Sequence, residues 1–232
     1  LCTTTPEKTF PASSAKVAAG LGITCGAMDL NVVCAGFPYG YVAAYGMMTT
    51  PGGPDNVLVV GSDAMSSIVD WTDRGTAILF GDGAGAVVLQ KGEQGEILGQ
   101  DFGVNGDLES ILYCDLNDTI VMEGREVFKR AVRAVTGSVQ NALAQAGVSA
   151  DDIDVVLPHQ ANIRIIEAVT QRLGIPMEKT HNVLEHTGNT SGASIPMAMA
   201  AASEAGVLQP GALVLMSGFG AGMAWGSVVV RW

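Results

Sequence analysis

Charged and aromatic side chains are scarce in this chain of 232 residues. Asp, Glu, Lys and Arg together make up 15% of it and Phe, Trp and Tyr 6%, whereas hydrophobic residues make up 48%. A chain this apolar can bury a sizeable core, which excludes an intrinsically disordered protein. Basic residues are rarer than acidic ones, since the chain has 12 Lys and Arg and 23 Asp and Glu, which gives a net charge of -11. That charge argues against nucleic acid or an anionic membrane as the main partner.

Cysteine pairs with metal-ligand or redox spacing are also lacking. The four cysteines are Cys2, Cys25, Cys34 and Cys114. None of them forms a C-x-x-C pair, so the sequence predicts neither a disulfide framework nor a metal site, and it favours a reducing compartment. The first residues contain no basic segment followed by a long apolar run, so no secretory signal is visible. We therefore expect a cytoplasmic protein.

Long uncharged runs raise the question of a membrane span. Residues 30–54 carry no charge, and that length is sufficient to cross a bilayer. Pro38, several glycines and polar residues within the run favour a buried strand followed by a buried helix instead. No membrane partner is expected.

Apolar runs of strand length alternate with helical patterns along the chain. Three segments have apolar residues at helical spacing and predict helices, namely 124–147, 162–173 and 194–205. The predicted strands are 30–33, 57–60, 77–80, 86–89, 154–157, 212–216 and 227–231. This alternation predicts an α/β protein with a largely parallel sheet.

Two parts of the chain resemble each other weakly. VLVVGSDA followed by FGDGAGAVVLQ in the first part has the same order of apolar strand, glycine-rich turn and apolar strand as ALVLMSGFGAGMAWGSVVVRW in the second. The pattern indicates a duplicated unit. The polar stretch 107–119 is the expected division, which gives halves at 1–118 and 119–232.

A glycine-rich segment superficially matches a dinucleotide-binding fingerprint. GDGAGA at 81–86 has the glycines, but that fingerprint requires a helix directly after them, whereas AVVLQ follows and is typical of a strand. The glycines are therefore interpreted as a turn. We expect no nicotinamide or flavin cofactor.

Three residues stand at junctions where catalytic groups often gather. Cys34 lies where a predicted strand meets a helix, whose N-terminus lowers a thiol's pKa and supplies N–H donors. His159 ends another apolar run, and Asn189 lies in a polar loop that enters a helix. Each has an ordinary structural explanation, as a buried thiol, a helix cap or an Asx turn. Together they supply a sulfur nucleophile and two hydrogen-bond donors for an oxyanion, which is the equipment of thioester chemistry.

The order Cys, His, Asn also occurs in papain-like proteases. The local signature of those proteases, C-G-[SA]-C-[WY], is absent, because Ala35 and Gly36 follow Cys34. A hydrolase therefore remains a weaker alternative.

Several long motifs resemble one family. They are CAGFPYG at 34–40, GSDAMS at 61–66, DRGTAILFGDGAGAVVL at 73–89, MEGREVF at 122–128, LPHQANIRII at 157–166, GNTSGASIP at 188–196 and GFGAGMAWGS at 218–227. In order and content they resemble 3-oxoacyl-acyl-carrier-protein synthase III. The resemblance implies the thiolase fold, a duplicated α/β unit in five layers (α-β-α-β-α), and a homodimer. The family's first strand-helix-strand segment has no counterpart, so the fold is expected to be N-terminally incomplete.

The resemblance also implies a reaction, a decarboxylative Claisen condensation that initiates fatty-acid synthesis. Cys34 would take the acyl group from an acyl-CoA primer, and malonyl-acyl-carrier protein would then lose CO2 and attack the acyl-cysteine to give 3-oxoacyl-acyl-carrier protein. His159 and Asn189 would stabilise the enolate, and the backbone N–H groups of Cys34 and Ala221 would form the oxyanion hole. Elongating synthases use two histidines and degradative thiolases a second cysteine near the C-terminus, and the sequence fits neither. No cofactor is needed, because acyl-CoA and malonyl-acyl-carrier protein are substrates.

Positions outside this centre are implied in the same way. The CoA contacts of the family fall on Arg74, Met122, Phe128, Ala161 and Asn162. Phe10 matches a residue that reaches from the partner subunit into the acyl pocket, and Arg164 and Lys129 match positions that dock the carrier protein.

The charge pattern gives independent support for a carrier-protein partner. Arg125, Lys129 and Arg133 recur at i, i+4 and i+8, so they share one face of a predicted helix. The alternative is a solvated face paired with Glu123 and Glu126.

Departures from the family leave the substrate open. Pro38, Thr187, Gly192 and Ala221 differ from the residues usual at those positions, and all four touch the expected site, so the primer's chain length or branching is not readable. A related condensing enzyme of secondary metabolism that uses malonyl-CoA, as type III polyketide synthases do, is the nearest alternative. A non-catalytic subunit that only binds acyl-carrier protein is another.

Overall fold

The computed structural model describes residues 1–92 and 95–232. Its helices are α1 (Ser13–Gly20), α2 (Gly36–Thr49), α3 (Arg74–Ala77), α4 (Gly124–Ala146), α5 (Ile163–Leu173), α6 (Leu184–Thr187) and α7 (Ser194–Glu204). Its strands are β1 (Asn56–Ala64), β2 (Asp82–Gln90), β3 (Glu96–Val104), β4 (Leu112–Tyr113), β5 (Val121–Met122), β6 (Val155–Pro158), β7 (Leu213–Gly220) and β8 (Ala224–Arg231).

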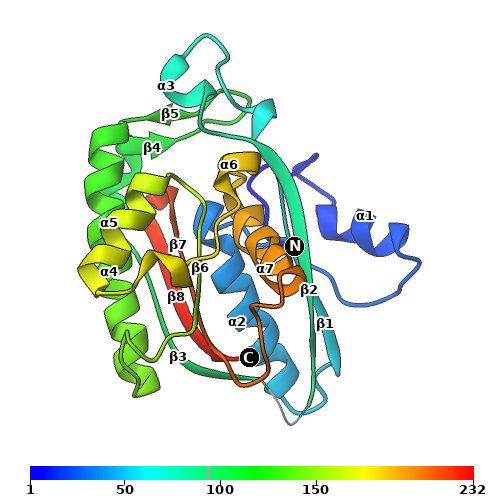
Figure 1. Ribbon diagram of the computed structural model, residues 1–232. Helices are drawn as coiled ribbons and strands as arrows, with labels where there is room; N and C mark the ends of the chain where they lie inside the picture. The colour runs from blue at the N-terminus through cyan, green and yellow to red at the C-terminus, as the bar shows by residue number, and fades with distance from the viewer. Residues whose placement is uncertain (93–94) are drawn as a thin grey trace.

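The elements stack in five layers, as the resemblance implies (Figure 1). Helices α4 and α5 form one outer layer and pack on a sheet of order β3-β8-β7-β6. The central layer is α2 and α7, which contact both this sheet and the pair β1-β2. Helix α1 lies beyond that pair. The segments that lead into α2 and α7 therefore lie between the two sheets.

Strand direction differs from the prediction of a largely parallel sheet, which is wrong. Only β6 and β7 run parallel among the named strands of the described residues, whereas β1-β2, β3-β8, β7-β8 and β4-β5 are antiparallel. The connection between β7 and β8 is only 221–223, and so short a link can join only antiparallel neighbours.

Two predicted strands are not strands. Residue 77 ends the short helix α3, which Asp73 caps by accepting from the Gly75 N–H, and residues 78–80 form a turn that ends in one isolated bridge, from Phe80 to Asn189. Residues 30–33 make one parallel bridge, from Leu30 to Cys2, before a 3-10 turn at Val33–Ala35.

Strand β3, which sequence reasoning did not predict, alters the expected division of the chain. It pairs antiparallel with β8 and so belongs to the second sheet. The chain therefore passes from the sheet β1-β2 to the sheet β3-β8-β7-β6 between β2 and β3. The predicted boundary between residues 118 and 119 lies farther along the chain, after β3.

The three predicted helices are present, with the expected end signals. On α4, Val127, Ala131, Val135 and Val139 are buried, and they pack toward β3 and β8. Gly147 ends this helix in the left-handed conformation, with φ 68°, which glycine adopts without a steric penalty.

Helix α5 is fixed at both ends. The Asn162 side chain caps its start by accepting the Arg164 N–H at 3.0 Å, and Gly174 closes it with φ 72°. Only residues 159–162 separate the end of β6 from the start of α5. His159 directly follows β6 and therefore lies at the edge of the sheet. Within the described part of the chain, no helix has both the length and the apolar character that crossing a membrane requires.

Candidate active site

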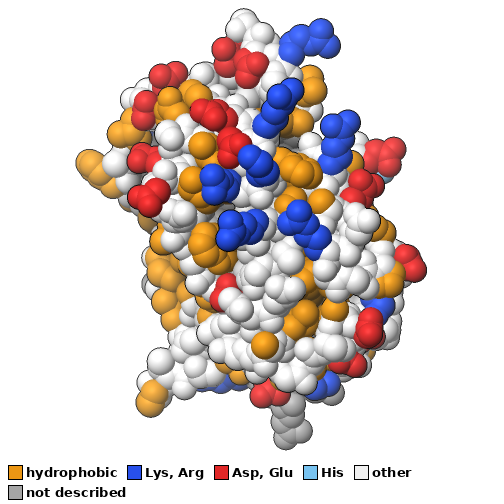
Figure 2. Space-filling model, turned by 90° about the vertical axis from the view of Figure 1, so that its left-hand side faces the viewer, with side chains coloured by type: hydrophobic (Ala, Val, Ile, Leu, Met, Phe, Trp, Pro, Cys, Tyr) orange, Lys and Arg blue, Asp and Glu red, His pale blue; other side chains and the backbone are white. Residues whose placement is uncertain are grey.

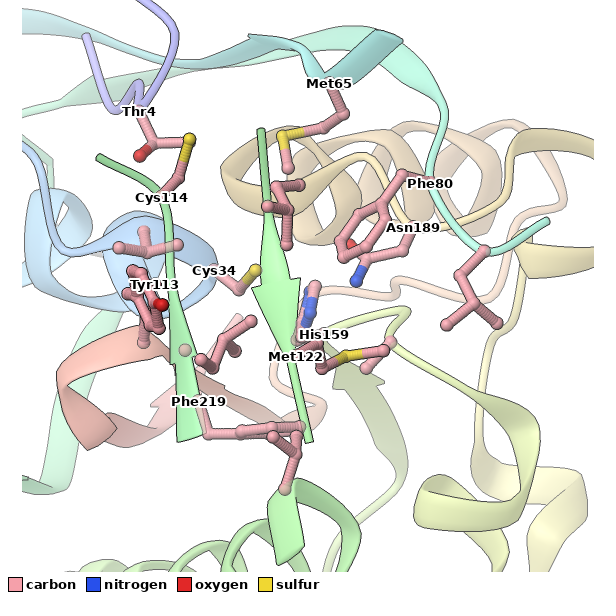
Figure 3. A pocket seen from close by; sticks show the side chains of 18 of the residues that line it. Thr4, Cys34, Met65, Phe80, Tyr113, Cys114, Met122, His159, Asn189 and Phe219 are labelled. Atoms are coloured by element: carbon pink, nitrogen blue, oxygen red, sulfur yellow. The ribbon is translucent and has the colours of Figure 1, made fainter. Parts of the chain in front are cut away.

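Cys34, His159 and Asn189 line one pocket of about 520 Å³. They come from the turn before α2, the residue after β6 and the loop before α7. Figure 3 shows the thiol, the imidazole and the side-chain amide directed into the same space. The spacing of the three residues along the chain could not show whether they meet, and the structure brings them together in this pocket.

Close backbone packing positions the nucleophile candidate. Cys34 lies in the 3-10 turn Val33–Ala35, directly before α2, and Val33 has φ 48°. Strand β7 runs beneath this turn, and a Cβ placed on Gly220 would lie 2.7 Å from the Cys34 nitrogen. Only a glycine lets the strand approach so closely.

The thiol differs electrostatically from the expectation. Burial raises the pKa of Cys34 to about 12, with a further rise from Asp63 and an opposing effect from Ser191. The prediction of a lowered pKa from the N-terminus of α2 is therefore wrong in direction, because burial removes the thiolate from water. Cys34 is therefore a thiol at neutral pH.

His159 is held by three contacts. The backbone N–H of His159 donates to the Ser217 carbonyl at 2.7 Å, and the ring Nδ1 lies 2.7 Å from Ser194 Oγ. Phe219 meets the ring edge-on, with 5.8 Å between centroids. Burial lowers the pKa of His159 to about 3, so the ring is neutral at physiological pH and can offer a hydrogen-bond donor but not an imidazolium acid.

The amide of Asn189 is oriented by its own loop. Its Oδ1 accepts the Ser191 N–H at 2.9 Å, while its backbone N–H donates to Leu79 O at 2.8 Å. Since the oxygen is engaged, the Nδ2 group is the one directed at the pocket beside His159 (Figure 3).

The pocket offers apolar walls around these donors. Its lining includes Met65, Ile68, Phe80, Leu112, Ile120, Met122, Val127 and Phe219. In residues 1–92 and 95–232, no cluster of three His, Cys, Asp or Glu could hold a metal ion. A thiol, two neutral N–H donors and apolar walls suit acyl transfer between thioesters.

The other predicted positions divide into two groups. Met122, Phe128, Ala161, Asn162 and Ala221 line the same pocket. Arg74, Phe10, Lys129 and Arg164 lie outside its lining.

Each of the outlying positions has a definite place. Arg74 begins α3, just before the lining residues Leu79 and Phe80. Phe10 is 82% exposed on the segment before α1. Lys129 pairs with Glu126 at 3.0 Å, and Arg164 occupies the first turn of α5.

Sequence reasoning missed a second set of residues around the site. Ser191 and Ser194 are fully buried and contact Cys34 and His159. Their signal was in the motif GNTSGASIP, which repeats small polar residues beside Asn189, but serine contacts cannot be read from spacing.

Asp63 was also missed. It is buried, and its carboxylate accepts from the N–H groups of Thr4, Thr5 and Gly192. It thereby joins the start of the chain to the loop that carries Asn189. A carboxylate that pairs with backbone amides instead of a cation leaves no charge pattern in the sequence.

Comparisons with known proteins agree with this geometry. Residues 28–106 match the family model described as 3-Oxoacyl-[acyl-carrier-protein (ACP)] synthase III, and residues 143–232 match the model of its C-terminal part. A beta-ketoacyl-[acyl-carrier-protein] synthase III of Bacillus cereus is 46% identical, over 100% of this chain and 74% of its own. One from Paracoccus denitrificans is 44% identical, over 100% and 76%.

Solved structures give the same picture. A 3-oxoacyl-[acyl-carrier-protein] synthase III from Aquifex aeolicus superposes with TM-score 0.97 at 42% identity, covering 100% of this chain and 75% of that one. A priming beta-ketosynthase from the R1128 polyketide biosynthetic pathway superposes with TM-score 0.92 at 33% identity, covering 99% and 73%.

Proposed function

Because this chain belongs to the 3-oxoacyl-[acyl-carrier-protein] synthase III family, we propose that Cys34, His159 and Asn189 are the catalytic residues of its condensation. The family relationship makes the protein an acyltransferase with the thiolase fold that initiates fatty-acid synthesis. One observation carries the assignment of residues, namely that a thiol, a neutral imidazole and an oriented amide converge in a single apolar pocket.

The first half-reaction transfers an acyl group to the protein. The Cys34 sulfur attacks the carbonyl carbon of an acyl-CoA, a new carbon–sulfur bond forms, and the bond to the CoA sulfur breaks. The thiol proton leaves with the CoA sulfur. Cys34 and Ala221 both line the pocket, and their backbone N–H groups are assigned as the donors to the oxyanion that forms during this transfer.

The second half-reaction forms the carbon–carbon bond. Malonyl-acyl-carrier protein loses CO2, and His159 and Asn189 donate hydrogen bonds to the enolate oxygen that results. The enolate carbon attacks the acyl-cysteine, the bond to Cys34 breaks, and the released sulfur takes up a proton. A neutral imidazole suits this role, because it stabilises the oxygen without protonating the reactive carbon.

Residues at the pocket are assigned to the pantetheine arm and the nucleotide of the substrates. Met122, Phe128, Ala161 and Asn162 line it and are assigned to the pantetheine arm, while Arg74 on α3 is assigned to the nucleotide end of CoA. No further cofactor is proposed. Phe128 is 38% exposed, so the lining continues to the surface at α4.

Lys129 and Arg164 are assigned to docking of the acyl-carrier protein. They follow the lining residues Phe128 and Asn162 on α4 and α5. Figure 2 shows Lys and Arg side chains gathered on this side of the molecule. Within the described residues Glu126 pairs with Lys129 and Arg130, whereas no ion pair engages Arg164. The face therefore retains positive charge for an acidic partner.

The assembly is proposed to be a homodimer in the cytoplasm. Phe10 is compatible with it, because its ring is 82% exposed and so is free to reach a second subunit. A reducing compartment would keep Cys34 as the free thiol that the reaction needs. Light scattering should give twice 23.9 kDa, and Phe10→Ser should weaken both association and acylation.

Intact mass after incubation with a panel of acyl-CoAs tests the assignment of Cys34. One acyl increment should appear, should map to the peptide that contains Cys34, and should be lost in Cys34→Ala. Cys25→Ala, which changes an exposed thiol, is the control and should keep the increment. If folded protein takes up no acyl group from any donor, the assignment of Cys34 fails, and a non-catalytic subunit that binds the carrier protein becomes the leading alternative.

The similarity to the priming ketosynthase favours a second candidate, a condensation in a specialised pathway. Measuring which primer and which extender substrate the protein prefers distinguishes the two candidate functions. Preference for malonyl-acyl-carrier protein with a short primer supports fatty-acid initiation, while turnover with free malonyl-CoA supports the alternative.

A further inference from the structure

Two serines in the loop that carries Asn189 have no role in the mechanism above. Ser191 and Ser194 are both fully buried in the segment that enters α7. Ser191 also has φ 50°, a left-handed conformation that costs a non-glycine residue free energy and is concentrated at functional sites. Both hydroxyls are directed at residues assigned to catalysis.

Ser191 contacts the reacting sulfur. The Oγ of Ser191 lies 3.5 Å from Cys34 Sγ, within hydrogen-bond range for sulfur. The backbone N–H of Ser191 donates to Asn189 Oδ1 at 2.9 Å and so orients the Asn189 amide. No other side-chain hydroxyl in the described residues contacts this sulfur. A hydroxyl in this place can donate to the sulfur when negative charge develops on it.

Ser194 contacts the far side of the imidazole. Its Oγ lies 2.7 Å from His159 Nδ1 and accepts the Gln160 N–H at 3.3 Å. Within the described part of the chain, Nδ1 is the one acceptor that the Ser194 hydroxyl proton reaches. With the hydroxyl donating to Nδ1, the ring's own proton sits on Nε2, on the side of the pocket.

We propose that these serines serve different half-reactions, Ser191 as a catalytic residue for acyl transfer to Cys34 and Ser194 as a positioning residue that keeps His159 in its Nε2–H form for decarboxylation. The proposal rests on the proposed function, because it assumes the roles of Cys34 and His159 given there.

The chemistry explains the division. In acyl transfer the Cys34 sulfur gains negative charge as its proton departs toward the CoA sulfur, and the Ser191 hydroxyl donates to it while keeping its own proton. During loss of CO2 the same sulfur is part of a thioester and carries no charge. The negative charge is then on the enolate oxygen, where only a ring with hydrogen on Nε2 can donate. Ser194 ensures that form without touching the substrate.

The tautomer can be observed without any activity. The chain has only three histidines, so ¹⁵N-histidine labelling gives few ring signals, and His159→Gln assigns the one that matters. In the unaltered protein we expect Nε2 protonated and Nδ1 unprotonated, and Ser194→Ala should shift the Nδ1 resonance as its donor is lost. A protonated Nδ1 in the unaltered protein would overturn the role of Ser194.

Separate rates for the two half-reactions test the division. Acylation is followed by intact mass with acyl-CoA, and decarboxylation by CO2 release from malonyl-acyl-carrier protein on acylated enzyme. Ser191→Ala should slow acylation about tenfold or more, and Ser194→Ala should slow CO2 release by a similar factor, which is the size expected for one lost hydrogen bond to a buried polar group. The ratio of the two rates should move in opposite directions in the two variants.

Ser203→Ala is the matched control, because Ser203 is an exposed serine on the same helix. It should leave both rates as they are. If the unaltered protein neither acylates nor condenses, the proposed function fails. If it does both and the two variants change both rates equally, the division between the serines fails while the function stands.

Discussion

At the scale of single residues, burial rather than charge pairing governs the ionisation of the site. Cys34 and His159 are both buried and both are shifted toward their neutral forms. A neutral thiol and a neutral ring can share a small apolar pocket without a counter-ion. As the proposed nucleophile, Cys34 would therefore lose its proton during the reaction instead of before it.

Alkylation of Cys34 should therefore keep accelerating with pH. Its pKa is about 12, so the thiolate fraction grows about tenfold for each pH unit between 6 and 9. The rate with iodoacetamide, followed on the peptide that contains Cys34, should rise accordingly. Cys25 is exposed and should react faster throughout. A rate that levels off below pH 8 would mean that the site stabilises the thiolate.

His159 should make the fold sensitive to acid. Its pKa falls from 6.5 to about 3 on burial, so the unfolded chain binds a proton that the folded chain refuses. The associated stability is complete above pH 6.5 and is lost as the pH falls toward 3. Between pH 7 and 5 this one residue should lower the free energy of unfolding by about 2 kcal/mol.

Urea denaturation of the unaltered protein and of His159→Gln at both pH values measures this effect. The variant keeps every carboxylate, so any acid loss that they cause cancels in the comparison. Equal pH dependence in the two proteins would show that His159 is not buried as a neutral ring.

At the scale of elements, close backbone contacts align the strand ends with the loops of the site. Strand β7 lies against the Cys34 turn at Gly220, and β1 lies against the loop at Gly192 through Gly61, where a Cβ would collide with Gly192 O. One contact therefore joins β7 to the turn of Cys34, and the other joins β1 to the loop that follows Asn189. The residues proposed as catalytic are therefore fixed by elements from both parts of the chain.

Two glycine substitutions should have opposite effects. Gly220→Ala forces a methyl group to 2.7 Å from the Cys34 nitrogen and should lower stability by about 1–3 kcal/mol together with the acylation rate. Gly137→Ala lies within α4 with nothing near the new Cβ and should raise stability by about 0.5–1 kcal/mol. Thermal unfolding and intact-mass acylation distinguish the two. An active Gly220→Ala would mean that the turn can shift freely.

At the scale of the whole molecule, charge is distributed unevenly. The chain carries a net charge of -11, yet Arg125, Lys129, Arg130, Arg133 and Arg164 are exposed together on α4 and α5. Because the pocket lining reaches the surface at Phe128 beside them, a negatively charged carrier would be attracted to this face and repelled by the acidic remainder of the surface.

Reversal of this charge should impair use of the carrier protein. The double variant Lys129→Glu, Arg164→Glu should raise KM for malonyl-acyl-carrier protein by about tenfold or more at low salt, and the difference should shrink as salt is added. Lys16→Glu reverses an exposed charge on α1, the opposite outer layer, and should not change KM. A double variant with normal KM would place docking elsewhere.

Local patterns in the sequence were sufficient for the amphipathic helices and for the motif residues. The apolar stripe and terminal Gly147 specify α4, and Asn162 and Gly174 specify α5, because caps and periodicity act over a few residues. The motifs around Cys34, His159 and Asn189 named the catalytic candidates and the family, and the described residues place all three in one pocket.

Only the tertiary structure decided strand direction, the place of β3 and the ionisation of the site. Pairing of β3 with β8 joins residues more than a hundred positions apart, which no local pattern encodes. The pKa of Cys34 could not be predicted from its helix N-terminus, because desolvation depends on every element packed around it. The contacts of Ser191, Ser194 and Asp63 arise in the same way, since they join segments that are adjacent only in the folded chain.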